Sequence, residues 1–161
     1  MTIQVGDKLP EATFRTMAAD GPAARTTAEI FAGKTIVLFA VPGAFTPTCH
    51  KNHLPGFVAH AEAIKAKGVD GIFVTSTNDV FVLDAWQKAT GAVDKVGILA
   101  DGSAEFAKAV GLDADMGAFG MGIRTKRYSM IVKDGVVTAL NIEDGPGKAD
   151  LSGADALIKQ L

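Results

Sequence analysis

Residues 35–50 of this chain read TIVLFAVPGAFTPTCH and join two different kinds of sequence. The first part, Thr35 to Val41, is β-branched and almost wholly apolar, which is typical of a strand buried on both faces of a sheet. The second part contains two prolines and leads to Cys49, the only cysteine in 161 residues. We expect a new helix to begin at this cysteine, where free backbone N–H groups and the helix dipole stabilise a thiolate.

Length and composition predict a single globular domain over residues 1–161. Hydrophobic residues make up 48 % of the chain and charged residues 21 %, which is ordinary for a folded protein without membrane spans. A net charge of −2 without a basic stripe argues against nucleic-acid binding. The first residues lack the pattern of a secretory signal and a lone cysteine fits a reducing compartment, so we expect a cytoplasmic protein without membrane contact.

Strand-like and helix-like patterns alternate through the first two thirds of the chain. A short strand at 13–17 and a helical turn at 27–31 are expected before the apolar run. After it we expect helices at 49–66, 79–90 and 104–110, and strands at 71–76 and 96–100. Pro55 is expected to kink the first of these helices near its first turns, or to delay its regular part, because proline has no N–H. Such alternation indicates parallel crossover connections.

The last third of the chain predicts a different kind of connection. Residues 112–123 are rich in glycine and methionine and are predicted to form a loop. Apolar runs at 128–132 and 136–140 are joined by Lys133-Asp134-Gly135, and Asp-Gly between two such runs is a strong hairpin signal. A short helix at 152–161, with Ser152 as its N-cap, is expected to end the chain. The fold class is therefore α/β, with a mixed central sheet flanked by helices and closed by an antiparallel hairpin.

The surroundings of Cys49 favour a chemical role for this cysteine. An isolated cysteine is most often a small buried side chain with no such role. Here the thiol stands where a strand gives way to a helix, and Thr46 offers a hydroxyl on the same turn. Pro42 and Pro47 stiffen the loop and remove two backbone donors, which suits a fixed pocket.

Three segments of the chain resemble one protein family. Residues 42–49, PGAFTPTC, resemble the Pro-x-x-x-Thr-x-x-Cys motif of the peroxiredoxins, and HLPGF at 53–57 resembles their type II subfamily, also called peroxiredoxin 5. KRYSM at 126–130 resembles that subfamily's Lys-Arg-Phe-Ser-Met segment, which carries its active-site arginine. The resemblance covers nearly the whole chain and implies a thioredoxin-like fold, peroxide reduction by a cysteine, and often a homodimer. No metal or other cofactor is expected.

The resemblance also implies a role for each matching residue. Cys49 would attack a peroxide oxygen and become a sulfenic acid. Thr46 would hold the peroxide through its hydroxyl, and Pro42 would shield the thiolate from water. Arg127 would stabilise the thiolate and the charge that develops on the oxygens. From the residues alone, the favoured interpretation makes Thr46 a helix cap and Arg127 a surface cation on an edge strand. Arg124 is a competing arginine, and the match at 126–130 favours Arg127 over it.

Substrate contacts are predicted for Gly43, Phe45 and Phe119. The two phenylalanines, with Met116 and Met121, would rim an apolar entrance suited to alkyl hydroperoxides, although such side chains near a loop are more often ordinary packing. The resemblance also makes Phe45 and Phe119 candidates for a dimer contact.

The chain departs from many type II members at the position of a second, resolving cysteine. Leu151 stands at that position, so no intramolecular disulfide can form. The resemblance then implies a peroxidase whose sulfenic acid is reduced by an external thiol: glutathione, a glutaredoxin or a thioredoxin. A bridge between the Cys49 residues of two subunits is the alternative, and it requires two recessed sulfurs to meet.

Other interpretations fit the cysteine less well. A thioredoxin-type exchanger would carry Cys-x-x-Cys, but position 46 holds threonine. A metal site at Cys49, His50 and His53 has too few further ligands, and histidines near a helix start are commonly exposed. A redox sensor or chaperone-like module would relay the oxidation to a partner protein and turn over slowly with glutathione. Residues 117–122 have the wrong glycine spacing for a phosphate-binding loop.

Overall fold

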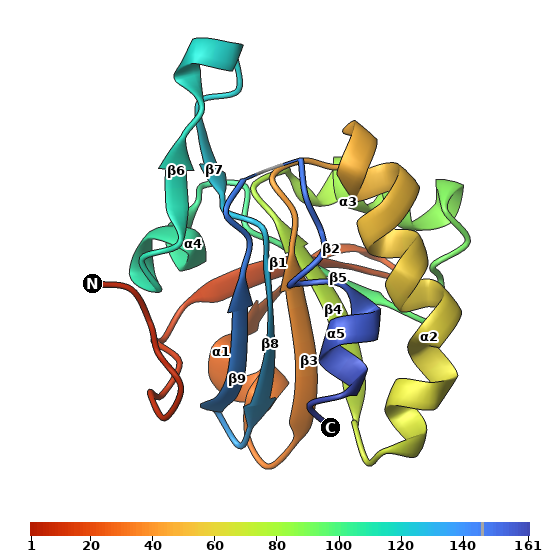
Figure 1. The fold of residues 1–161 in the computed structure, drawn as a ribbon. Helices are drawn as coiled ribbons and strands as arrows, with labels where there is room; N and C mark the ends of the chain where they lie inside the picture. The colour runs from red at the N-terminus through yellow and green to blue at the C-terminus, as the bar shows by residue number, and fades with distance from the viewer. Residues whose placement is uncertain (146) are drawn as a thin grey trace.

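A seven-stranded mixed sheet forms the centre of the molecule (Figure 1). The computed structural model describes residues 1–145 and 147–161. Along the sheet the strand order is β2-β1-β5-β4-β3-β8-β9, and β6 and β7 form a separate two-stranded hairpin. The strands are β1 (Thr13–Ala18), β2 (Gly21–Thr26), β3 (Thr35–Ala40), β4 (Gly71–Ser76), β5 (Gly97–Ala100), β6 (Asp113–Asp115), β7 (Ile123–Thr125), β8 (Tyr128–Lys133) and β9 (Val136–Ile142).

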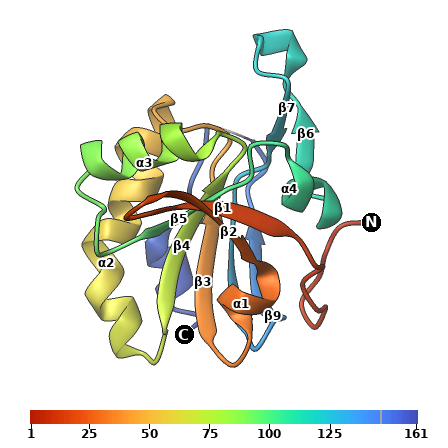
Figure 2. The ribbon, with the colours of Figure 1, turned by 180° about the vertical axis from the view of Figure 1, so that it is seen from behind.

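Helices cover both faces of this sheet (Figures 1 and 2). They are α1 (Thr27–Phe31), the π-helical turn η1 (Cys49–His53), α2 (Leu54–Ala66), α3 (Val80–Ala89), α4 (Glu105–Ala109), the 3₁₀ turn η2 (Gly117–Phe119) and α5 (Ala154–Ile158). Within the described ranges, no helix has both the length and the apolar character that a bilayer span requires.

Strand β3 separates two hydrophobic cores. Successive side chains of a strand point to opposite faces, so Val37 and Phe39 join one core while Ile36 and Leu38 join the other. The first core lies under α2, α3 and α5, and the second under α1 and α4. Because both faces are covered, the strand can be apolar at every position, as its sequence predicted.

The expected mixed sheet is confirmed, with its parallel part in the middle. Strand β3 pairs parallel with β4, and β4 pairs parallel with β5. On its other side β3 pairs antiparallel with β8, and β8 pairs antiparallel with β9. Asp134 and Gly135 make the turn between β8 and β9 with φ of 48° and 77°, a left-handed conformation that the Asp-Gly sequence favours.

The register between β3 and β8 brings a distant segment to the end of the apolar strand. Ala40 pairs with Tyr128. The residue before Tyr128 therefore lies beside the loop that follows Ala40, although more than eighty positions separate them in the sequence. This is the geometric reason why Arg127 reaches the cysteine loop.

The helix after the cysteine loop begins irregularly. Residues 49–53 form a π-helical turn in which the Leu54 N–H donates to the carbonyl of Cys49, and the regular α-helix starts at Leu54. Pro55 has no N–H to offer to the preceding turn, so the ordinary α-helical ladder cannot run through it. The predicted delay of the regular helix is confirmed, and its physical form is a wider turn, of the kind often found at functional sites.

Three sequence predictions need correction. Strand β2 was not expected, because GPAART has weak strand propensity; its pairing along the whole of β1 holds it in place. Residues 112–123 are not simply a loop, because β6 pairs with β7 and the hairpin projects from the body of the molecule (Figure 1). Ser152 is not the N-cap of α5: Gly153 precedes that helix, and the Ser152 hydroxyl donates to Glu143 instead, at 2.6 Å.

Candidate active site

Cys49 is a free, fully buried thiol at the first position of the π-helical turn. Its sulfur accepts a hydrogen bond from Nη2 of Arg127 at 2.9 Å. Arg127 is itself almost completely buried, with 3 % of its surface exposed. A guanidinium held out of water against a sulfur stabilises negative charge there far better than an exposed cation does.

Two arginines lie near the cysteine loop, and they do different things. Arg127 contacts Cys49, whereas Arg124 donates from Nε to the carbonyl of Met121 at 2.9 Å and from Nη1 to that of Pro42 at 3.0 Å. Arg124 thus ties the β6–β7 hairpin to the loop that follows β3.

The loop between β3 and the π-helical turn is fixed from several directions. Thr46 donates from its hydroxyl to the carbonyl of Gly43 at 2.6 Å, and the carbonyl of Thr46 accepts from the His50 N–H at 2.9 Å. The Ala44 N–H donates to Oδ1 of Asn78 at 2.8 Å. Asn78 follows β4, so the loops after two neighbouring parallel strands support each other at the same edge of the sheet.

Phe45 occupies the outer side of this loop. It is half exposed and has a positive φ of 63°, which is uncommon for a bulky residue. Its ring stacks on that of His50, with centroids 5.6 Å apart, and Nδ1 of His50 accepts from Nε1 of Trp86 at 3.0 Å. The only tryptophan of the chain therefore contacts the residue next to Cys49.

His53 is a site residue that sequence reasoning missed. It was expected to be exposed, as histidines near a helix start commonly are, but it is buried with 1 % of its surface exposed. Its Nδ1 accepts from Nη1 of Arg127 at 2.9 Å, so one guanidinium spans Cys49 and His53. The available signal was the spacing of four between the two residues, which puts both on one side of a helical turn.

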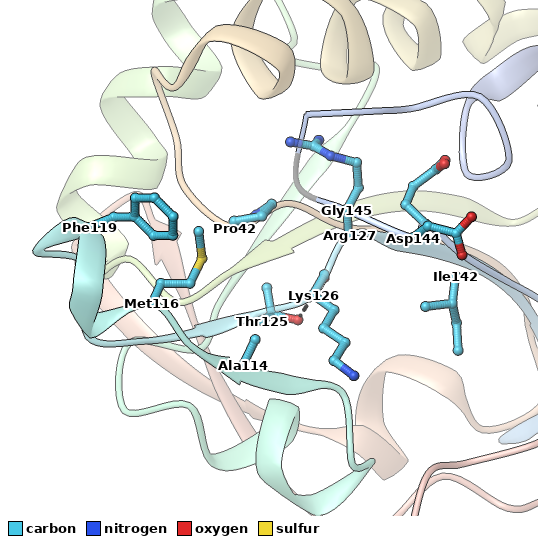
Figure 3. A pocket seen from close by; sticks show the side chains of 11 residues that line it. Pro42, Ala114, Met116, Phe119, Thr125, Lys126, Arg127, Ile142, Asp144 and Gly145 are labelled. Carbon is cyan, nitrogen blue, oxygen red and sulfur yellow. Dashed lines mark hydrogen bonds between the residues drawn. The ribbon is translucent and has the colours of Figure 1, made fainter.

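A cavity of about 280 Å³ lies beside Arg127. Met116 and Phe119, from the segment between β6 and β7, lie together in it, with Pro42 between them and Arg127 (Figure 3). The remaining lining residues are Ala114, Thr125, Lys126, Ile142, Glu143, Asp144 and Gly145. The cavity combines an apolar wall with charged groups, as small-molecule sites commonly do.

The predicted substrate contacts fall in different places. Phe119 lines this cavity, although 78 % of its surface is exposed. Phe45 stacks on His50. Gly43 is enclosed by the loop, where an added Cβ would lie 3.0 Å from Nη1 of Arg124 and 3.1 Å from Cγ2 of Thr46.

The chain is similar to known proteins in both sequence and fold. Residues 4–158 match the Redoxin family. The chain is 47 % identical to "Peroxiredoxin-2E-2, chloroplastic" of Oryza sativa, over 99 % of this chain and 73 % of the relative. It superimposes on a reduced Prx3 of Vibrio vulnificus, described as in complex with H₂O₂, with a TM-score of 0.94, 46 % identity and 99 % of both chains covered. A Plasmodium falciparum antioxidant protein, described as a 1-Cys peroxiredoxin, gives a TM-score of 0.89 at 26 % identity, with 98 % of both chains covered.

The chain belongs to the peroxiredoxin family, in its type II form with a single cysteine. Its fold is the thioredoxin-like fold of that family, and its activity is that of a thiol-dependent peroxidase. Family members use peroxide substrates and thiol reductants.

Proposed function

We propose that Cys49 reduces hydrogen peroxide and organic hydroperoxides, with Arg127 stabilising both the thiolate and the departing oxygen. The observation that carries this proposal is the buried 2.9 Å contact between Nη2 of Arg127 and the sulfur of Cys49. The guanidinium is planar and its charge is delocalised, so it can stabilise negative charge on the peroxide oxygens as well as on the sulfur.

The proposed reaction has three steps: oxidation of Cys49, formation of a mixed disulfide, and release of the Cys49 thiol. The Cys49 thiolate attacks one peroxide oxygen, the O–O bond breaks, and the released alkoxide or hydroxide takes a proton to leave as an alcohol or water. The resulting sulfenic acid condenses with an external thiol, forming a mixed disulfide and water. A second thiol attacks the external sulfur of the mixed disulfide, which breaks the bond to Cys49, releases the two external thiols as a disulfide and restores the Cys49 thiol.

Thr46 and Pro42 support the first step in this proposal. The Thr46 hydroxyl donates its hydrogen bond to the Gly43 carbonyl, so its oxygen can accept a hydrogen bond from the peroxide. Pro42 covers the site without adding a backbone N–H of its own. Positioning of this kind matters because the rate depends steeply on how the reacting atoms are aligned.

The cavity beside Arg127 is the proposed place for the organic part of a hydroperoxide. Met116, Phe119 and Ile142 supply apolar surface there, and Pro42 links the cavity to the cysteine loop. We infer that alkyl hydroperoxides gain affinity from this wall, whereas hydrogen peroxide does not use it. Gly43 and Phe45 shape the loop in this account.

The proposed reductant is an external thiol: glutathione, a glutaredoxin or a thioredoxin. The chain has one cysteine and Leu151 stands where many type II members carry a second, so the chain itself has no second thiol to resolve the sulfenic acid. A bridge between two Cys49 residues is disfavoured because the sulfur is fully buried. Turnover with glutathione alone would show that a small thiol can reach the sulfenic acid without a glutaredoxin or a thioredoxin.

We further propose that residues 1–161 act as one domain and that the protein is a homodimer in the cytoplasm. Phe45 and Phe119 expose 50 % and 78 % of their surfaces at the end of the molecule that carries the site, which supports a contact between subunits there. The single cysteine supports a reducing compartment. Light scattering of the F119D variant tests the dimer: dissociation supports it, and an unchanged mass argues against this contact.

Peroxide consumption tests the function. Wild-type protein is compared with C49S, using hydrogen peroxide or cumene hydroperoxide, with glutathione, glutaredoxin and thioredoxin systems side by side. Turnover by the wild type and none by C49S supports the proposal. Oxidation of Cys49 without turnover in every reductant system would instead support a redox sensor.

A further inference from the structure

His53 connects the guanidinium of Arg127 to the C-terminal segment. Its Nδ1 accepts from Nη1 of Arg127, and its Nε2 lies 2.9 Å from the carbonyl oxygen of Ser152. A guanidinium can only donate and a carbonyl can only accept, so Nδ1 carries no proton and Nε2 carries one. The two neighbours therefore define a single neutral tautomer.

The surroundings hold the ring in that state. Phe39 and Phe57 flank it with centroids 5.0 Å and 5.6 Å away. The pKa of His53 is lowered from 6.5 to about 3, chiefly by burial and also by the positive Arg127, while the bond to the Ser152 carbonyl opposes them. The titratable groups near the ring are Arg127, the Cys49 thiol on the same helical turn and, beyond Ser152, Glu143. His60, Asp150 and Asp155 line a cavity together with His53. His53 is thus neutral throughout the neutral pH range.

The hydrogen bonds continue past Ser152 and return to Arg127. The N–H and hydroxyl of Ser152 donate to Oε2 of Glu143, at 2.5 Å and 2.6 Å. The backbone N–H of Glu143 donates to the carbonyl of Arg127 at 3.0 Å. Arg127 is therefore hydrogen-bonded at its backbone to Glu143 and at its guanidinium to His53. Both Glu143 and His53 are in turn hydrogen-bonded to Ser152.

We propose that His53 is a positioning residue that holds the Arg127 guanidinium against Cys49, with Glu143 and Ser152 anchoring it from the C-terminal segment. This proposal rests on the proposed role of Arg127 and Cys49. A guanidinium on a long side chain has many orientations, and a shift of about 1 Å in a catalytic group can cost about a hundredfold in rate. Because the neutral His53 accepts a hydrogen bond from Nη1, the plane of the guanidinium is fixed and Nη2 is directed at the Cys49 sulfur.

The test is the rate at which the reduced protein reacts with hydrogen peroxide, followed by stopped-flow fluorescence of Trp86. We expect H53L to react about a hundredfold more slowly, because it removes the acceptor for Arg127. H53N retains an acceptor near the position of Nδ1 and is expected to recover most of the rate. H60L is the matched control, because His60 lies on α2 and contacts Gly56 and the exposed Asp155; its rate should equal that of the wild type.

A second arm separates positioning from a general structural effect. In the R127Q background, adding H53N or H53L should change the rate less than about twofold, because there is no guanidinium left to orient. An equal loss in both backgrounds would overturn the proposal, as would a wild-type rate for H53L. If H53L does not fold, H53A takes its place, because it removes the same acceptor: it must be slower than the wild type with Arg127 present and not slower than R127Q in the R127Q background.

Failure of this proposal is distinguishable from failure of the proposed function. If C49S consumes peroxide as fast as the wild type, both are overturned. If the reaction depends on Cys49 and Arg127 but the His53 variants match the wild type, only the positioning role is overturned.

Discussion

Nη2 of Arg127 lies 2.9 Å from the sulfur of Cys49, although 78 positions separate the two residues in the sequence. The antiparallel pairing of Ala40 with Tyr128 brings them together, so the sheet register decides whether the site forms. A change that shifts β8 against β3 by one residue would reverse its faces and remove the arginine from the cysteine.

Replacing Arg127 by alanine should reduce the rate of reaction with peroxide by about a hundred- to a thousandfold, the cost of removing one preorganised donor. The loss should exceed the loss of thiolate, which ultraviolet absorbance measures directly on the same samples. R124Q is the comparison, because that arginine holds the loop through Pro42 and does not contact the sulfur in the hydrogen bonds described. We expect a smaller loss for R124Q; a rate loss in R127A that merely follows its thiolate fraction would contradict this account.

The orientation of the Thr46 hydroxyl should affect the rate of reaction with peroxide. It donates to the Gly43 carbonyl at 2.6 Å and so presents lone pairs elsewhere. T46S retains this arrangement and should remain within a few fold of the wild type, whereas T46V should react about a hundredfold more slowly. Stopped-flow rates of reaction with hydrogen peroxide, measured for T46S and T46V at the same pH, test this expectation. Equal rates for the two variants would show that the hydroxyl only caps the loop.

A methyl group at position 43 should disturb the site. The added Cβ would lie 3.0 Å from Nη1 of Arg124 and 3.1 Å from Cγ2 of Thr46, so one of these neighbours must move. We expect G43A to lose about tenfold in peroxide rate, since small displacements of positioned groups have large effects. The matched control is G56A in α2, where the nearest atom to an added Cβ is 4.0 Å away. That variant should keep its rate and gain about 0.5–1 kcal/mol in stability from helix propensity.

His53 should make the protein sensitive to acid. Its pKa falls from 6.5 to about 3 on folding, chiefly because burial disfavours the charged form. Between these values the unfolded chain binds the proton and the folded one does not, so stability falls as pH falls through this window. The contribution is complete above pH 6.5, and the slope is about 1.4 kcal/mol per pH unit.

Urea denaturation of the wild type and H53N at several pH values measures this effect. H53N should lack the His53 part of the slope. Burial raises the pKa of Asp101, which contributes a slope of opposite sign, but this contribution is common to both proteins and cancels in the comparison. Identical pH profiles for the two proteins would contradict the burial of a neutral His53.

Much of the fold was predictable because local and global signals agree. The apolar run at 35–40 is buried on both faces, the alternating segments form the parallel part of the sheet, and Asp134-Gly135 turns the β8–β9 hairpin. The motif at 42–49 led to the cysteine loop for the same reason, since its residue types suit a stiff turn before a helix.

The parts that were not predictable depend on tertiary contacts. Strands β2 and β6 have weak strand propensity and exist through their partners. Ser152 has the residue type and spacing of a helix cap, but Glu143, which directly follows β9, accepts the hydrogen bond from its hydroxyl. His53 was expected to be exposed because Arg127, which contacts it in the fold, lies 74 positions away in the sequence.

The proposed cycle requires that peroxide oxidises Cys49 and that another molecule then reduces the sulfenic acid. Both steps are followed by intact mass after one equivalent of hydrogen peroxide and then one equivalent of glutathione, with C49S as the control and a non-reducing gel run alongside. We expect a gain of one oxygen atom, its replacement by a glutathione adduct, and recovery of the original mass with excess glutathione, with no change in C49S. A lasting covalent dimer, or an oxygen gained equally by C49S, would contradict it.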